Sequence, residues 1–189
     1  MAETRFSGPV RANTKETDGE LFIPASDFQF DVGTWTLTRS AVGNYFMRKT
    51  AAANTSNPSI SVQARVLKKI GADPGSSAHD IRGVQVTAID VLYAIATDVL
   101  TAHTAAFRRS TYANNAAVVT AAVGGALAGA LATATQANPY LTALTPATPF
   151  VLGNNVTDVA DWFELTVTAT ATCVYDLYGV FVRFSYNLL

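Results

Sequence analysis

The residue types that acid–base or nucleophilic catalysis requires are scarce in this chain. Its only histidines are His79 and His103, and histidine is the side chain that most often moves protons at neutral pH. Ser76, Ser77, His79 and Asp80 lie close together along the chain and supply the residue types of a catalytic triad. Triads are assembled from separated segments, because residues this close on one loop rarely reach the required geometry. We therefore predict a surface loop here, no catalytic residue in the chain, and a protein that is not an enzyme.

Ligands for a metal ion are also sparse. Asp158, Asp161 and Glu164 carry the carboxylates that calcium prefers, but their spacing matches no calcium loop, and we interpret them as solvated turn residues. Cys173 is the only cysteine, so it forms no internal disulfide, and the chain has no CxxC or HxH pair for a metal. We predict no metal site and no cofactor, and a buried, inert thiol at Cys173.

Aromatic side chains offer a second kind of chemistry, namely stacking on sugar rings. The candidates are Trp35, Trp162, Tyr45 and Tyr140. Trp162 precedes Phe163 in an alternating segment and lies in its outward-facing register, so we expect it to be partly exposed. Aromatic residues more often fill cores or protein interfaces, and the sequence leaves both interpretations open.

Charge is low throughout the sequence. Charged residues make up 14% of the chain, against about a quarter in an average soluble protein. The 13 basic and 14 acidic residues give a formal net charge of −1, so no overall field would attract nucleic acid or an anionic membrane, and we predict neither partner. The pairs Lys68-Lys69 and Arg108-Arg109 form no concentrated patch, because adjacent strand residues point to opposite faces. A surface so poor in charge suits a protein that neighbours cover in an assembly.

The most apolar stretch runs from Ala116 to Ala134. Its apolar character comes mainly from Ala and Gly, whereas a membrane helix requires about 20 strongly apolar residues. We expect a buried helix of small residues or a pair of loosely alternating strands. The chain begins MAETRFSGPV, without a basic region followed by an apolar run, so we predict synthesis in a cytoplasm without a secretion signal.

Residues 1–31 mix charge, prolines and isolated aromatics and predict an extended N-terminal arm, followed by a single domain at residues 32–189. The connection from Gln136 to Asp161 contains several prolines and an Asn-Asn pair, so we expect an irregular crossing with one short strand at residues 150–152. Elsewhere in the domain, alternation with a period of two predicts strands at residues 34–38, 44–47, 60–66, 82–96 and 102–112.

The clearest signal lies between Trp162 and Tyr186. From Phe163 to Cys173, apolar residues alternate with Glu and Thr without exception, which is typical of a strand buried on one face. Several such strands, separated by loops rich in Pro, Gly and Asn, predict an all-β fold, namely an antiparallel β-sandwich of the jelly-roll type. After Asp176 the parity changes, and the inward set is expected to be Tyr178, Val180, Val182, Phe184 and Tyr186.

Two segments resemble bacteriophage virion proteins with a jelly-roll-like β-sandwich, a class that includes capsid decoration and cement proteins. They are GVQVTAIDVLYAIATDVLTAHTAAFRRSTYAN (83–114) and WFELTVTATATCVYDLYGVFVRFSYN (162–187). The shared landmarks are a long strand ending near Tyr93, a Tyr-Ala-Asn turn, a Thr/Val strand and a closing YGVxVxF strand. The resemblance covers about the second half of the chain. It implies self-assembly, commonly as a homotrimer, and docking on the major capsid protein.

The sequence therefore favours a non-enzymatic virion structural protein. We expect a capsid decoration, cement or minor capsid protein that stabilises the shell through protein–protein contacts, made in the host cytoplasm and located in the virion. Its expected partners are the major capsid protein or other virion proteins, together with further copies of itself in a homotrimer. The alternative is a glycan- or receptor-binding module of a phage tail or fibre, which would use the exposed aromatic residues.

Overall fold

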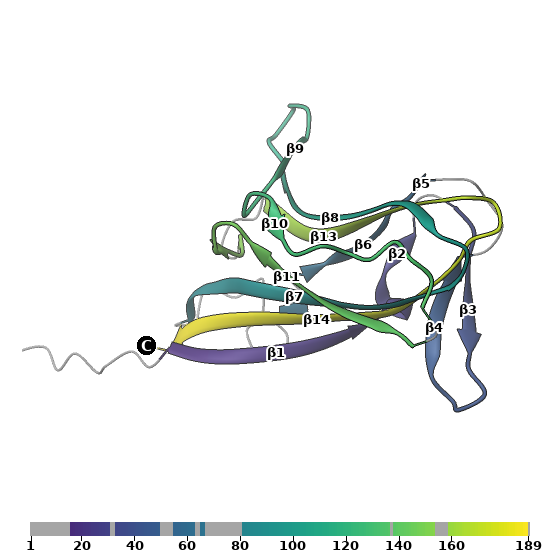
Figure 1. The fold of residues 1–189 in the computed structure, drawn as a ribbon. Coiled ribbons are helices and arrows are strands. Elements are labelled where there is room, and N and C mark those ends of the chain that lie inside the picture. Colours follow the sequence, from purple (N-terminus) through teal and green to yellow (C-terminus); the bar gives the residue numbers. More distant parts are fainter. Residues whose placement is uncertain are drawn as a thin grey trace, which may run out of the picture.

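The computed structural model describes residues 16–30, 33–49, 55–62, 65–66, 81–136, 138–153 and 159–188. Within these ranges, two antiparallel sheets pack against each other as a β-sandwich (Figure 1). The predicted all-β, jelly-roll-like class is therefore confirmed. None of the helical residues in the described ranges forms a helix long and apolar enough to cross a membrane.

The large sheet is built around its last strand, β14, which is paired along both edges. β7 follows one edge of β14 from Val174 to Leu188. The other edge is shared, because β4 pairs with Tyr175–Leu177 and β1 pairs with Gly179–Asn187. The eight strands of this sheet are β1 (Glu16–Pro24), β3 (Trp35–Arg39), β4 (Tyr45–Lys49), β7 (Ile81–Thr97), β10 (Leu127–Ala128), β11 (Tyr140–Pro146), β12 (Phe150–Val151) and β14 (Val174–Leu188).

The small sheet has β13 at its centre. β8 pairs with one edge of β13, and β5 and β6 share the other. β7 and β8 follow each other in the sequence but lie in different sheets, because the chain turns a corner at Asp98, which has a positive φ of 62°. The six strands are β2 (Gln29–Phe30), β5 (Thr55–Ser56), β6 (Pro58–Ser61), β8 (Leu100–Thr111), β9 (Val119–Ala122) and β13 (Val159–Ala169).

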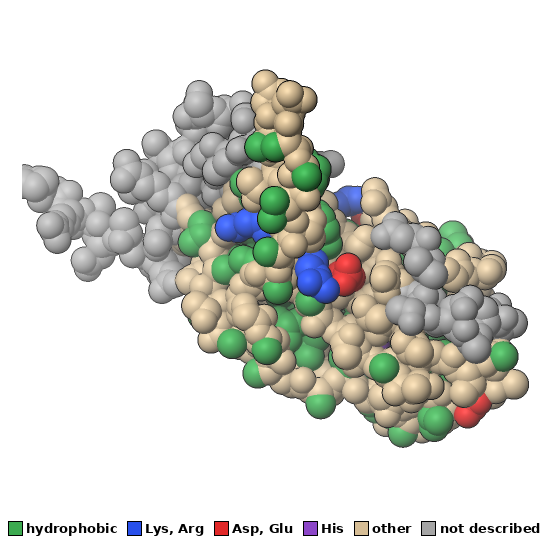
Figure 2. Space-filling view, turned by 90° about the horizontal axis from the view of Figure 1, so that it is seen from above, with side chains coloured by type: hydrophobic (Ala, Val, Ile, Leu, Met, Phe, Trp, Pro, Cys, Tyr) green, Lys and Arg blue, Asp and Glu red, His purple; other side chains and the backbone are tan. Residues whose placement is uncertain are grey.

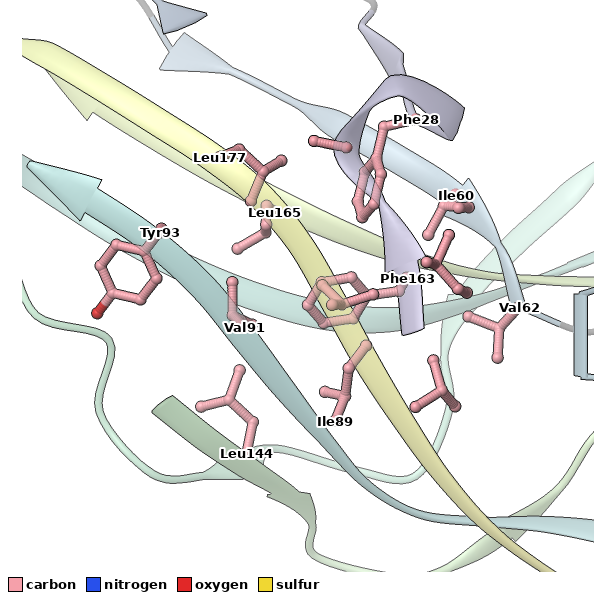
Figure 3. Packing of buried hydrophobic residues seen from close by; sticks show 14 of the residues in the cluster. Phe28, Ile60, Val62, Ile89, Val91, Tyr93, Leu144, Phe163, Leu165 and Leu177 are labelled. Atoms are coloured by element: carbon pink, nitrogen blue, oxygen red, sulfur yellow. The ribbon is translucent and has the colours of Figure 1, made fainter. Parts of the chain in front are cut away.

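Side-chain alternation places the core between the two sheets. Phe163 and Leu165 of β13 are fully buried and face Ile89 and Val91 of β7 (Figure 3). The intervening residues of β13, from Trp162 to Thr168, are only partly buried, as the period of two predicts. β13 ends at Ala169. A turn follows, in which the Cys173 N–H donates to the Thr170 carbonyl oxygen at 3.3 Å. The Cys173 side chain is buried, as predicted.

The parity change in β14 occurs later than predicted. Tyr175 and Leu177 belong to the core, and so does Val180, because a register shift between Leu177 and Gly179 leaves Tyr178 outside the regular ladder. Tyr178 packs instead against Phe46, with ring centroids 5.1 Å apart. Its predicted inward position is wrong, because a register shift between Leu177 and Gly179, and not Asp176, resets the alternation.

Three further segments can be compared with their predictions. The strand predicted at residues 60–66 ends at Ser61, and residues 62, 65 and 66 are helical. Val62 and Val66 are nevertheless fully buried, since a spacing of four also suits a helix. The crossing predicted from 136 to 161 contains β11 in addition to the expected strand at β12. The stretch 116–134 contains two short strands, β9 and β10, which agrees with the second of its two predicted forms and not with a buried helix.

The N-terminal segment is extended, and its described part is built into both sheets. β1 runs along β14 from Glu16 to Pro24, a 3-10 turn follows at Ala25–Asp27 (η1), and β2 joins the small sheet through β6. Residues 1–15, 31 and 32 lie outside the described residues, so the boundary between an arm at 1–31 and a domain at 32–189 stays a prediction.

Deletion of residues 1–31 is expected to abolish cooperative folding or to lower the midpoint of thermal unfolding strongly. It removes Ile23 and Phe28, which are 2% and 6% exposed, and burial of each such side chain contributes about 1.5–3 kcal/mol against a total stability of about 5–15 kcal/mol. It also opens one edge of β14 to aggregation. Thermal unfolding followed by circular dichroism checks this.

Deletion of residues 1–15 is the matched control, because it leaves every strand of the described sandwich in place. An unchanged unfolding midpoint after deletion of 1–31 would show that β1 and β2 contribute little to the fold.

Candidate functional site

A groove on the outer face of the small sheet gathers polar side chains and one aromatic side chain. Its volume is ≈ 370 Å³. The lining residues come from four places in the chain, namely η1, β2, the region of β6, and β13. They are Asp27, Gln29, Ser59, Ile60, Ser61, Arg65, Trp162 and Glu164.

Strand register explains why the outer face is hollow at this point. Ser61 of β6 lies opposite Trp162 of β13, and Ser59 lies opposite Glu164. Successive outward positions of β6 therefore carry small serines beside the large indole and carboxylate of β13. Gln29 of β2 lies beyond Ser59 and closes the row. The groove is thus a consequence of small residues on β6 between larger residues on β2 and β13.

Both carboxylates of the groove are held by arginines. Arg65 Nη1 lies 2.9 Å from Asp27 Oδ2 on one rim, and Arg108 Nη2 lies 3.3 Å from Glu164 Oε1 on the other. These groups are only partly buried, with side-chain exposures of 43% and 33% for the first pair and 37% and 24% for the second. Exposed pairs of this kind contribute at most about 1 kcal/mol to stability. Their clearer effect is to hold the carboxylates in place and to balance their charge.

Among the candidate aromatic residues, only Trp162 lines this groove. It is partly exposed, as its outward register predicted. Trp35 packs against Phe30 with ring centroids 4.8 Å apart, and Tyr140 stacks on Tyr93 at 5.2 Å, so both support the core. Tyr45 is 60% exposed on β4, away from the groove residues.

A second surface is defined by its lack of charge. No residue from Ser110 to Thr157 is charged, and every residue from Thr111 to Ala122 is exposed. This stretch includes the β8–β9 hairpin, which projects from the sandwich (Figure 1). Seen from above, the described part of the molecule shows few charged side chains (Figure 2). We call the described residues of 110–153 the charge-free side, and its exposed large apolar residues are Tyr112, Val118, Val119, Leu141 and Val151, each between 44% and 63% exposed.

His103 lies beneath the charge-free side and has a structural role. It is 8% exposed, with Nδ1 3.1 Å from the Ala132 carbonyl oxygen and Nε2 3.1 Å from the Tyr175 hydroxyl. A neutral ring with its proton on Nδ1 satisfies both, because Nδ1–H donates to Ala132 and Nε2 accepts from Tyr175. Burial lowers the pKa of His103 to about 4. The Tyr93 hydroxyl accepts the Ala132 N–H at 2.6 Å, so the two side chains tie this segment to the core.

The other candidate residues that the structure describes are engaged in ion pairs. Asp161 is buried, and its carboxylate accepts Arg109 Nε at 2.6 Å and the Gly153 N–H at 2.7 Å. The interpretation of Asp161 as a solvated turn residue is therefore wrong, since a paired arginine and a backbone donor allow the charge to be buried. Arg108 and Arg109 bind different acids, as expected for adjacent strand residues.

Several predicted positions lie outside the described residues, namely Lys68, Lys69, Ser76, Ser77, His79, Asp80 and Asp158. Among the residues that are described, no group of three His, Cys, Asp or Glu side chains could hold a metal ion.

Sequence reasoning missed half of the groove. The alternation of β6 places Ser61 outward, and that of β13 places Trp162 and Glu164 outward, so the sequence alone could predict the outward positions of these residues. The positions of Asp27 and Arg65 could not be predicted, because they reach the groove through the pairing of β2 with β6 and through the helical residues after Ser61. No local pattern in the sequence records that pairing.

Comparisons with known proteins add little to this geometry. No family model matches the chain, and no curated protein matches it. Among solved structures, the chain is similar to a family 6 carbohydrate-binding module whose binding sub-sites were dissected by crystallography and calorimetry. The identity is 12% and the TM-score 0.41, over 85% of this chain and 90% of the module. A likeness at this level carries no argument about binding, so function is argued from the residues alone.

The buried state of His103 predicts a loss of stability in mild acid. Its pKa in the folded protein is about 4, below the value of about 6.5 expected for the unfolded chain. The unfolded state therefore takes up a proton first as the pH falls. The contribution of neutral His103 is fully present above pH 6.5 and is lost progressively between about 6.5 and 4, reaching about 3 kcal/mol. Urea unfolding at pH 7 and pH 4.5 measures the loss.

The variant His103→Gln is expected to be less stable at pH 7 but to lose less stability between these two pH values. His79→Gln is the matched control, and between pH 7 and pH 4.5 it should lose as much stability as the wild type. If the wild type and His103→Gln lost the same amount of stability between the two pH values, the loss could not be assigned to His103.

Proposed function

We propose that this protein is a non-enzymatic structural component of a bacteriophage virion, in the position of a capsid decoration, cement or minor capsid protein. The observation that carries the proposal is the charge-free side, an uncharged run from Ser110 onwards that is exposed throughout from Thr111 to Ala122 and includes β9, the end strand of the small sheet. The resemblance of residues 83–114 and 162–187 to virion proteins points in the same direction.

Uncharged exposed surface favours burial against another protein. Charge normally keeps soluble proteins apart, and dense charge also blunts open sheet edges. β9 has neither protection, because its four residues are Val, Thr and Ala and all are exposed. Its second edge has no strand partner among the described residues. Covering this hairpin removes apolar area from water without burying an unpaired charge.

The mechanism of such a component is mechanical. Strand-edge pairing and apolar burial at subunit boundaries add cohesion to a shell, and no chemical step is required. The described ionisable side chains fit this role, because Arg48–Asp176, Arg109–Asp161 and Arg183–Asp90 are all ion pairs that link strands. The partners that we propose are the major capsid protein or another virion protein, and further copies of this chain in a homotrimer.

The second candidate is a glycan- or receptor-binding module of a phage tail or fibre. The Trp162 groove favours it, since an indole with neighbouring amide, hydroxyl and carboxylate groups is a suitable surface for a hydroxylated ligand. A tail module should bind soluble glycans and lose binding in Trp162→Ala, whereas a capsid component should bind empty capsids from the same genome whether or not it binds glycans.

The variant Val119→Lys tests the proposed assembly function. Val119 is 63% exposed in the projecting hairpin, so a lysine is tolerated in the monomer but would be buried without a counter-charge in an interface. We expect self-association, or binding to empty capsids, to weaken tenfold or more, which corresponds to about 1.4 kcal/mol. Size-exclusion chromatography with light scattering measures self-association, and co-sedimentation measures binding to capsids.

Val42→Lys is the matched control, because Val42 is 84% exposed in the β3–β4 turn, on another side of the sandwich (Figure 1). It should associate like the wild type. If the wild-type protein is a strict monomer and also fails to bind capsids, the proposal is overturned. If Val119→Lys and Val42→Lys have equal effects, the charge-free side is not the contact surface.

A further inference from the structure

We infer that the groove at Trp162 is a binding site for a neutral saccharide, with one sugar ring stacked on the exposed part of the indole. The inference goes beyond the assembly function and rests on the second candidate function, glycan or receptor binding. It adds a class of ligand and the residues that would bind it. It does not depend on where in a particle the protein lies.

The shape of the groove limits the ligand to a short segment. Its volume of ≈ 370 Å³ is at the lower end of the range of about 300–1,000 Å³ for small-molecule sites. Its floor is a sheet, so the positions of Ser59, Ser61, Trp162 and Glu164 are fixed by backbone pairing rather than by a loop. A rigid platform of this kind binds without a large ordering cost.

The chemistry of the lining suits a molecule with apolar faces and hydroxylated edges. The indole of Trp162 offers an apolar surface to the C–H face of a sugar ring. Around it, Ser59, Ser61 and Gln29 supply hydroxyl and amide groups that both donate and accept hydrogen bonds. The carboxylates of Asp27 and Glu164 are acceptors for sugar hydroxyl groups, and their arginine partners hold them in position.

Charge balance selects a neutral ligand. Asp27 is paired with Arg65, and Glu164 is paired with Arg108, so the two acids and two bases around the groove cancel. An anionic ligand such as a nucleic acid or a sulfated glycan would therefore gain no net electrostatic attraction at the groove. A basic peptide would find both carboxylates already occupied by arginines. A purely apolar ligand would leave the polar groups of the rim without partners.

The test uses the full-length protein with Trp35→Phe as background, so that Trp162 is the only tryptophan. Its fluorescence is followed while neutral oligosaccharides of glucose, xylose, mannose, galactose and N-acetylglucosamine are added, with a sulfated glycan and an oligolysine peptide for comparison. We expect at least one neutral oligosaccharide to shift the emission in a saturable way. Its affinity should be the same in low and high salt, because no net charge is neutralised.

Variants locate the site by calorimetry on the wild-type background. Trp162→Ala and Glu164→Gln should each weaken binding of that oligosaccharide, the first by tenfold or more, with melting temperatures recorded to confirm folding. Tyr45→Ala removes an exposed aromatic outside the groove and should leave affinity unchanged.

The inference is overturned if none of these neutral saccharides binds, if the sulfated glycan or the peptide binds in their place, or if Trp162→Ala binds as well as the wild type. Self-association and capsid binding of the same variants report separately on the assembly function. Loss of glycan binding with intact assembly, and the reverse, are therefore distinguishable.

Discussion

Pairing along both edges of β14 is the constraint on which the rest of the sandwich depends. β7 follows one edge, and β1 and β4 divide the other at Gly179. A Cβ at Gly179 would lie 2.3 Å from the Ile23 carbonyl oxygen, and its φ of 152° also disfavours a side chain. Only glycine therefore lets β1 approach at the point where the register shift beside Tyr178 resets the alternation. Gly179 thus permits the close approach of β1 next to the point where its pairing with β14 begins.

The parts of the fold that could be predicted are those in which burial is recorded locally. β13 and the long strands β7 and β14 each keep one face in the core, so a period of two marks them in the sequence. β1 was not predicted, because its pairing depends on an edge of β14 more than 150 residues away in the chain. β11 was missed because Pro139 precedes it and Pro146 is its last residue, and prolines at the ends of a strand are tolerated more easily than prolines in its middle.

The candidate site also has a part that the sequence could predict and a part that it could not. The outward register of Trp162 follows from the burial of Phe163 beside it, so the exposed indole could be predicted from β13 alone. What turns it into a groove is the pairing of β13 with β6 and of β6 with β2, and long-range pairing leaves no trace in spacing. The role of His103 was equally inaccessible, since its partners Ala132 and Tyr175 come from distant segments.

The Trp162 groove and β9, the part of the charge-free side that belongs to the small sheet, lie at opposite ends of the strand order of that sheet. In the order β2-β6-β13-β8-β9, the Trp162 groove spans the first three strands, and the charge-free side begins at the end of β8 and continues through β9. Contact through β9 buries apolar, uncharged groups and needs no water, whereas the groove offers hydrogen-bonding groups that act in a wet site. A subunit held in an assembly by its β9 edge would therefore keep the groove open to solvent. The two proposed functions, assembly and glycan binding, would therefore use different residues.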